Sequence, residues 1–365
     1  MSELDPNAIR RCVDAWVDPW LEQSLGDAGV VRQVELSGDK LTVALELPYA
    51  AACEHQALKD ALAEELKRSC GVTDVSIDVQ QKIKATGSEK QLPGLAGVRN
   101  IIAVASGKGG VGKSTTTANL ALALKAQGAR VGVLDADIYG PSQGMMLGVP
   151  SGTRPQTAED DKFFLPVESH GVQVMSMSFL VDDDTPMVWR GPMVSGALQQ
   201  LLNQTKWNDL DYLLIDMPPG TGDIQLTLSQ RVPVSGAVIV TTPQDIALLD
   251  ARKGIEMFRK VDIPVLGVVE NMSTHICSNC GHEEAVFGAG GGEKLSQDYD
   301  CKLLGQLPLT LAIREQSDGG KPSVVSDPES AHAKRYLEIA ARLSACLVRK
   351  VGSTPRGPKI QIFGD

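Results

Sequence analysis

Residues 106–115 read Ser-Gly-Lys-Gly-Gly-Val-Gly-Lys-Ser-Thr and lie between an apolar run typical of a strand and an alanine- and leucine-rich run typical of a helix. Gly107, Gly112, Lys113 and Ser114 satisfy the pattern G-x-x-x-x-G-K-[ST] of a phosphate-binding loop. Glycines let successive backbone N–H groups converge on phosphate oxygens, and the helix N-terminus behind the loop adds a favourable dipole. The stretch therefore predicts a nucleotide site. The alternative is a glycine-rich turn that binds nothing.

The polar side chains of this loop have separate expected roles. Lys113 should reach the β- and γ-phosphates, and the Ser114 hydroxyl should ligate Mg²⁺. Lys108 is a second lysine, at a position where an ordinary phosphate-binding loop accepts almost any residue, and a solvated surface lysine is the alternative there. The residues of the loop expected to bind the nucleotide are Gly107, Lys108, Gly109, Gly110, Val111, Gly112, Lys113, Ser114 and Thr115.

Aspartates follow two other strand-like runs. Asp216 ends the run Leu213–Asp216 as the carboxylate of a Walker B motif does, so it should help to hold the Mg²⁺ shell. Asp135 and Asp137 close a second run. For these carboxylates the alternative is helix capping at a strand–helix turn. Met217–Asp223, rich in proline and glycine, suits a switch loop because proline fixes φ and glycine adopts backbone conformations that other residues avoid.

Short runs of β-branched residues alternate with helical patterns from Val98 onward. Such runs indicate parallel strands buried on both faces. The expected fold class is α/β: a P-loop NTPase with a mostly parallel sheet covered by helices on both faces, plus a small N-terminal α+β domain. The predicted strands of the sheet are Ile101–Ala105, Val131–Leu134, Val172–Met175, Tyr212–Ile215, Gly236–Val240 and Val265–Val269.

The domain organisation follows from changes in composition and periodicity. We expect a small α+β domain over residues 1–85, a linker over 86–97, the P-loop ATPase domain over 98–350 and a tail over 351–365. In the first domain, Asp5 and Pro6 should start a helix, and Gly71 should stop another. The other predicted elements are the strands Val31–Leu36, Leu41–Leu47 and Val75–Val79 and the helices Ala57–Cys70 and Ala331–Arg349.

Composition narrows the class of protein. With 42% hydrophobic and 22% charged residues, the chain has the composition of a soluble globular protein. A net charge of −10 without a basic block argues against general nucleic-acid binding. Met1–Pro6 has acidic residues where a signal peptide needs basic ones, and no apolar run has the length of a membrane span. Seven cysteines, an odd number, suggest reduced thiols. We therefore expect a cytoplasmic protein with no membrane and no nucleic-acid partner.

Cys277 and Cys280 form a C-x-x-C pair, with His275 and His282 on either side. Two thiolates at this spacing can ligate one soft metal centre, but they supply only half of a four-cysteine site. Three completions are open: a zinc site finished by the histidines, an iron–sulfur cluster bridged to the same pair of a second subunit, or a redox dithiol. The dithiol is the weakest of these, because the pair does not open a helix.

The loop Gly107–Thr115 resembles the deviant Walker A motif of the MinD/ParA/nitrogenase-iron-protein class of ATPases. The resemblance implies ATP as the nucleotide and a homodimer in which Lys108 reaches the partner's nucleotide and neutralises charge on the transferred phosphoryl group. It also implies that Asp137 positions the attacking water, with Asp135 nearer the metal shell, and that the Asn271 amide contacts adenine. A turn asparagine is the alternative for Asn271. The expected catalytic residues are Lys108, Lys113, Asp137 and Asp216.

A wider set of motifs resembles the Mrp/ApbC family of iron–sulfur cluster carrier ATPases, over roughly residues 95–345. The N-terminal unit resembles the small iron–sulfur-assembly domain that bacterial members carry. That domain often has Thr and Cys-Pro near a reactive cysteine, and both the threonine and the proline are missing around Cys53, so we expect Cys53 to be a buried cysteine at a helix start. The motifs are Ser106–Thr115, Asp135–Ser142, Trp189–Met193, Asp216–Asp223, Thr242–Asp245, Glu270–Ser273 and Cys277–Cys280.

This second resemblance implies a function. It implies an ATP hydrolase that binds a [4Fe–4S] cluster at a homodimer interface through Cys277 and Cys280 and transfers it to apo-proteins, with apo iron–sulfur proteins and a cluster-assembly scaffold as partners. The alternative is a MinD/ParA-like positioning ATPase with a structural zinc site. That class needs a C-terminal amphipathic helix or a basic DNA face, and Pro355–Asp365 is neither. An electron-transferring ATPase is disfavoured, because it would need two well-separated cysteines per subunit, and Cys277 and Cys280 are close together.

Overall fold

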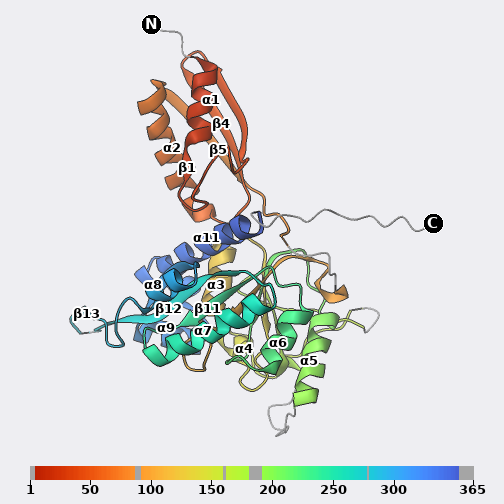
Figure 1. The fold of residues 1–365 in the computed structure, drawn as a ribbon. Coiled ribbons are helices and arrows are strands. Elements are labelled where there is room, and N and C mark those ends of the chain that lie inside the picture. Colours follow the sequence, from red (N-terminus) through yellow and green to blue (C-terminus); the bar gives the residue numbers. More distant parts are fainter. Residues whose placement is uncertain (1–4, 87–91, 159–161, 181–190, 278, 353–365) are drawn as a thin grey trace.

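The computed structural model describes residues 5–86, 92–158, 162–180, 191–277 and 279–352. Its larger unit is built on one sheet (Figure 1). The strand order is β13 (Glu283–Glu284), β12 (Val265–Ile276), β11 (Gly236–Thr241), β6 (Val98–Ala105), β10 (Leu210–Asp216), β7 (Val131–Asp135), β9 (Val172–Ser176) and β8 (Val167–Ser169), and β14 (Lys302–Leu309) also pairs with β12. Neighbouring strands are parallel, except that β8 is antiparallel to β9 and β13 to β12.

Every strand predicted for this sheet is present, and the α/β class is confirmed. All seven residues of β10 are buried, which explains why its sequence is a continuous apolar run rather than an alternating one. The predictions missed β8, β13 and β14. They also ended β12 too early: the strand continues past Val269 to Ile276, so that Cys277 follows it directly.

Helices cover both faces of the sheet because the right-handed crossovers run in opposite directions along it, from β6 through α3 (Lys113–Ala126) to β7 and from β10 through α6 (Asp223–Arg231) back to β11. One face carries α3 and α11 (Ala331–Gly352), which pack against each other. The other face carries α6, α7 (Asp245–Lys260) and α8 (Gly291–Asp298). The remaining helices are α4 (Gln143–Met146), α5 (Gly191–Gln204), α9 (Leu311–Asp318) and α10 (Ser323–Ser326). Residues 116–124 of α3 are all buried, because the helix lies between the sheet and α11.

The N-terminal unit has its own sheet, in the order β3 (Val31–Ser37), β4 (Lys40–Leu47) and β5 (Asp74–Gln81). Two helices accompany it, α1 (Pro6–Ala15) and α2 (His55–Cys70). The Asp5 carboxylate caps α1 by accepting a hydrogen bond of 2.9 Å from the Asn7 N–H, and Gly71 ends α2 in the left-handed region at φ 70°. Both signals were read correctly from the sequence. Two further short strands are β1 (Val17–Asp18) and β2 (Gln23–Ser24).

The N-terminal unit docks on α11 (Figure 1). Ala341 and Ala345 of that helix are fully buried within the hydrophobic cluster of the N-terminal unit. Between them, the Ser344 hydroxyl donates to the Ala50 carbonyl at 3.0 Å and accepts from the Ala50 N–H at 3.1 Å. Small side chains on one face of α11 therefore let a second unit approach closely.

No helix within the described ranges is both long and apolar enough to span a bilayer. Parts of the predicted linker (residues 87–91), the tail (353–365), Trp189 and Arg190 lie outside the described residues.

Candidate functional site

The predicted phosphate-binding loop connects the end of β6 to the start of α3 at the carboxyl edge of the sheet. Gly110 and Gly112 adopt φ values of 80° and 81°, a region in which a side chain would be strained. Gly107 is required for a different reason: a Cβ at this position would overlap the backbone of Asp250 in α7. The loop therefore takes the tight, glycine-dependent path that exposes the first turn of α3 to a ligand.

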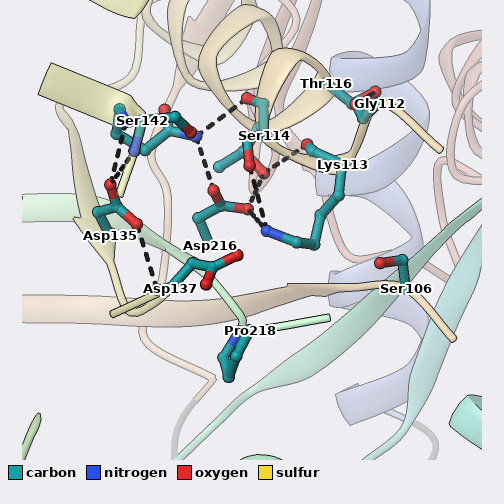
Figure 2. A network of polar contacts seen from close by, with 12 residues as sticks. Ser106, Gly112, Lys113, Ser114, Thr116, Asp135, Asp137, Ser142, Asp216 and Pro218 are labelled. Carbon is teal, nitrogen blue, oxygen red and sulfur yellow. Dashed lines mark hydrogen bonds and ion pairs between the residues drawn. The ribbon is translucent and has the colours of Figure 1, made fainter. Parts of the chain in front are cut away.

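Lys113 and Asp216 form a buried ion pair in this site. The lysine Nζ lies 2.6 Å from Asp216 Oδ1, and the two side chains are 6% and 0% exposed. Lys113 Nζ also lies 3.2 Å from the Ser114 hydroxyl, and the Thr117 hydroxyl donates to Asp216 Oδ1 at 3.1 Å. Figure 2 shows Lys113, Ser114 and Asp216 pointing toward one another. The structure therefore brings together the residues predicted to hold phosphate and Mg²⁺.

Asp135 lies beside Asp216, because the two residues are partners in register on the parallel strands β7 and β10. Asp135 is fully buried. Its Oδ1 accepts from the Asp137 N–H at 3.2 Å, and its Oδ2 accepts from the N–H groups of Ser142 and Gln143 at 2.9 and 3.0 Å. Burial and the neighbouring Asp216 raise the pKa of Asp135 to about 7. This geometry is that of the capping alternative: Asp135 ties the loop 137–143 to the sheet. Its part in the metal shell stays a prediction.

Asp137 is half-buried and lies near Asp216 and Lys113 in Figure 2. Burial raises the pKa of its carboxyl, while the Lys113 ammonium acts in the opposite direction. A carboxylate with a raised pKa beside a phosphate site is suited to accept or orient a proton of water. Its predicted role remains a prediction.

Asn271 lies at the point where β12 passes the phosphate-binding loop. Its Nδ2 donates to the Val111 carbonyl at 2.8 Å, and a Cβ at Gly112 would overlap this amide. The Asn271 amide thus holds the phosphate-binding loop through the Val111 carbonyl. The adenine contact implied for Asn271 stays a prediction. Lys108 and Thr115 are half-buried, and the Ser106 hydroxyl donates to the Lys108 carbonyl at 2.9 Å.

The predicted switch loop is attached to the same site. The Gly220 N–H donates to the Ser106 carbonyl at 3.0 Å, and Gly220 takes a φ of 100°, which favours glycine. The Gln225 amide of α6 donates to the Pro218 carbonyl. A movement of the loop Met217–Gly222 would therefore displace both the phosphate-binding loop and α6, because it is hydrogen-bonded to each.

Sequence patterns did not indicate one side chain of this polar network, Gln143. It is fully buried, and its Nε2 donates at 2.9 Å both to Asp216 Oδ2 and to the Ser114 carbonyl. Glutamine belongs to no motif at this spacing, so the only available signal was its position soon after Asp135 and Asp137.

The cysteine pair sits on a turn at the end of β12. The Cys277 N–H donates to the His282 carbonyl, and the Gly281 N–H donates to the Cys277 carbonyl, both at 2.9 Å. The backbone N–H groups of Cys280 and Asn279 and the Cys280 side chain lower the pKa of the Cys277 thiol. Cys280 is exposed. A thiolate, the form that binds a soft metal, is thus favoured at the half-buried Cys277, next to the exposed Cys280.

The flanking histidines do not join this pair. His275 Nδ1 lies 3.4 Å from the Leu309 carbonyl of β14. In the parts of the chain that the structure describes, no three His, Cys, Asp or Glu side chains gather as a metal-binding group.

The prediction for Cys53 was wrong. Cys53 is exposed rather than buried, in the short 3-10 helix Ala52–Glu54. Its Sγ lies 3.5 Å from the Ala126 carbonyl, and its N–H donates to the Gln127 side chain at 2.8 Å. The residue faces the junction with the end of α3 and not the core of its own unit, which its sequence neighbours do not reveal.

The donor sets fit the groups implied by the motifs. A hydroxyl from Ser114 and a carboxylate from Asp216 are hard oxygen ligands suited to Mg²⁺, and the N-terminus of α3 is suited to phosphate. Cys277 and Cys280 supply two thiolates for a soft metal centre.

Comparison with known proteins agrees with this site. The profile of the NUBPL iron-transfer P-loop NTPases, within the ParA group, matches residues 97–344, and the chain belongs to this family. The profile described as an iron–sulfur cluster assembly protein matches residues 7–79.

Individual relatives are similar over most of their length. An iron–sulfur cluster carrier protein of Pseudomonas fragi is 68% identical over 74% of this chain and 94% of its own. One of Escherichia coli K12 is 52% identical over 94% of this chain and 93% of its own. Among solved structures, a nucleotide-binding protein from Archaeoglobus fulgidus in complex with ADP is 37% identical, with a TM-score of 0.57 over 66% of this chain and 93% of that one.

Proposed function

We propose that this protein is an iron–sulfur cluster carrier that binds and hydrolyses ATP. Two copies of the chain hold one [4Fe–4S] cluster as cargo through Cys277 and Cys280 of each copy, receive it from an assembly scaffold and transfer it to apo iron–sulfur proteins. The observation that carries the proposal is the accessible C-x-x-C turn at the end of β12, the strand whose Asn271 also supports the phosphate-binding loop. The named relatives are cluster carriers, which supports the same assignment.

In the nucleotide site, the N–H groups at the start of α3 and the Lys113 ammonium bind the β- and γ-phosphates. Mg²⁺, when bound, neutralises charge on the phosphates, and Ser114 and Asp216 are the side chains that hold it. Asp137 orients the attacking water. Lys108 of the second copy adds positive charge where negative charge develops.

Dimerisation through the carboxyl edge of the sheet is supported by the distribution of exposed apolar side chains. Tyr139, Ile246, Leu249 and Leu311 are 63%, 69%, 56% and 55% exposed, and each follows soon after the end of a parallel strand. These ends share one edge of the sheet with the nucleotide site. A second copy placed there would cover the apolar side chains and bring Lys108 to the opposite nucleotide.

Nucleotide and cluster are connected through β12. Asn271 contacts the phosphate-binding loop, and Cys277 follows the end of the same strand. Met272, between them, has a φ of 57°, and the pairing of β12 with β14 is irregular here. A change in the loop upon ATP binding or hydrolysis would therefore reach the cysteines and loosen the cluster. We assign the protein to the cytoplasm, where thiols stay reduced.

The test is anaerobic reconstitution with iron and sulfide, followed by iron and sulfide counts, visible absorbance and analytical ultracentrifugation. Wild type should take up about four iron per dimer and absorb broadly in the visible range. Cys277→Ser and Cys280→Ser should lose both, while the control Cys53→Ser, at a cysteine that is exposed like Cys280, should keep the cluster. One zinc per monomer with no iron uptake would refute the carrier and favour a positioning ATPase with a structural zinc.

A further inference from the structure

We propose that the N-terminal unit regulates nucleotide binding in its own chain: it caps the carboxyl end of α3, the helix whose amino end forms the predicted phosphate site, so that docking of the unit and binding of the nucleotide strengthen each other. The inference rests on the proposed function, because it requires that a nucleotide binds at the start of α3. It gives the N-terminal unit a role that is separate from any contact with another protein.

The carboxyl end of α3 satisfies part of its backbone by itself. The N–H groups of Gly128 and Ala129 donate back to carbonyls of the last turn at 3.0 and 3.1 Å, with Gly128 at a φ of 85°. This is the arrangement with which many helices end at a glycine. The carbonyls of Ala126, the last residue of α3, and of Gln127 accept their hydrogen bonds from elsewhere. These two carbonyls are therefore the place where another part of the chain can complete the helix end.

The N-terminal unit donates to both carbonyls. The Ala126 oxygen lies 3.5 Å from the Cys53 Sγ. The Gln127 oxygen accepts from the Ala52 N–H at 3.2 Å and from Gln81 Nε2 at 3.1 Å. The Gln127 side chain returns the contact, because its Oε1 accepts from the Cys53 N–H at 2.8 Å. The N–H groups at the start of the short helix that leads into α2 thus pair with the acceptors at the end of α3, and each helix end satisfies the other.

This junction is closely packed and is shared with α11. A Cβ at Gly128 would lie 3.3 Å from both the Ala52 Cβ and the Gln81 Nε2, so the glycine also permits the close approach. Gln127 is fully buried, and its Nε2 donates to the Leu337 carbonyl of α11 at 3.3 Å. The end of α3 is therefore held by the N-terminal unit and by the helix on which that unit docks.

The two ends of α3 belong to different sites, and the helix between them is rigid. Its first residue is Lys113, which is predicted to bind phosphate, and residues 116–124 are all buried between the sheet and α11. A phosphate at the amino end and the docked unit at the carboxyl end restrain the same helix. Whichever binds first orders the helix, so the second loses less conformational entropy on binding. Coupling of this kind is reciprocal, so each event should strengthen the other by the same factor.

The first measurement is the affinity of the full-length protein for ADP with Mg²⁺, by calorimetry. Gln81→Glu leaves the whole ATPase domain unchanged and places a carboxylate against the Gln127 carbonyl, at the negative end of the α3 dipole. We expect ADP affinity to fall about fivefold or more, the lower limit of a typical coupling between sites. Gln80→Glu is the matched control, the same change at the exposed neighbouring residue, and should stay within about twofold of wild type.

The second measurement is the reciprocal one, hydrogen exchange at the amides of Ala52 and Cys53. Both N–H groups donate to Gln127 in the docked arrangement, so their protection reports docking. Saturating ADP should slow their exchange in wild type by the same factor by which Gln81→Glu weakens ADP binding. In Gln81→Glu without nucleotide, the two amides should exchange faster than in wild type.

Several results would overturn the proposal. They are an exchange rate at Ala52 and Cys53 that ADP does not change in wild type, equal weakening of ADP binding in Gln81→Glu and Gln80→Glu, and tighter ADP binding in Gln81→Glu. ADP affinity that stays at the wild-type value while exchange shows the unit undocked would overturn it as well. If the unit stays docked in Gln81→Glu, Ala345→Glu, which acts on the α11 contact, carries the same expectation. A wild type that binds no ADP would instead refute the nucleotide function itself.

Discussion

Lys113 Nζ lies 2.6 Å from Asp216 Oδ1, with both side chains buried at the end of β10. The lysine predicted to bind phosphate and the carboxylate predicted to hold Mg²⁺ therefore neutralise each other in this structure. A nucleotide with Mg²⁺ offers each of them a stronger partner, phosphate for the lysine and the cation for the carboxylate. Binding would exchange one ion pair for two, which lowers the cost of bringing charges into a buried site.

Lys113→Ala should abolish nucleotide binding and also destabilise the fold. Removal of the ammonium leaves Asp216 buried, without its counter-charge and next to Asp135, and an unpaired buried charge costs about 3–5 kcal/mol. Urea unfolding and ADP titration measure the two effects. The double variant Lys113→Ala/Asp216→Ala should recover part of the stability but none of the ADP binding. Wild-type stability in the single variant would show that the ion pair does not persist in solution.

Lys108→Ala should leave ADP affinity nearly unchanged and lower the rate of ATP hydrolysis. The reason is that Lys108 is assigned to the nucleotide of the partner subunit, where its charge acts on the transition state. Steady-state hydrolysis and ADP titration, run in parallel with Lys113→Ala, separate the two lysines. An equal loss of affinity in both variants would place Lys108 on its own nucleotide instead.

Asp137→Asn should bind ATP and fail to hydrolyse it. The amide cannot orient or take a proton from water as the carboxylate can, so the rate should fall about 100-fold or more. The measurement is single-turnover hydrolysis with the bound nucleotide identified after gel filtration. A wild-type rate in this variant would remove Asp137 from the assigned role.

The stability of the nucleotide-free protein should depend on Asp135. Its pKa is raised to about 7 by burial and by Asp216, whereas in the unfolded chain it lies near 4. A carboxyl of this kind binds its proton more tightly when folded, so its contribution is full at low pH and is lost as the pH rises from about 4 to about 7. Between pH 5.5 and 8 the loss amounts to roughly 2 kcal/mol. Urea unfolding should show this fall in wild type and a smaller one in Asp135→Asn; equal slopes would contradict it.

Ala345→Glu should detach the N-terminal unit from α11. Ala345 is fully buried in the hydrophobic cluster of that unit, so the new carboxylate would have to be desolvated for docking to persist. We expect thermal unfolding to separate into two transitions, with the N-terminal unit melting first. Ala331→Glu, the same change at an exposed position of α11, is the matched control and should behave as wild type. A single unchanged transition in Ala345→Glu would show that the two units do not depend on this contact.

Local patterns were sufficient for the fold class. The phosphate-binding loop, the apolar runs around it and the signals at Asp5, Pro6 and Gly71 each act within a few residues, because φ preferences, capping and burial period are local properties. The pattern could not show the continuation of β12 to Ile276, since residues 270–276 are polar and their pairing is with the unpredicted strand β14.

The amino-acid sequence by itself determined the fold class and the family, and it predicted the residues of the nucleotide and cysteine sites, because short motifs carry this information. Only the tertiary structure decided which contacts these residues make and which of them are exposed. Register on neighbouring strands places Asp135 beside Asp216 and makes it the anchor of a loop. Packing places the Gln143 side chain against Asp216. It leaves Cys53 exposed at the junction between the two units, and it places the N-terminal unit against α11. These contacts join residues that are far apart in the chain, so they cannot be predicted from periodicity or from a motif, both of which describe only neighbouring residues.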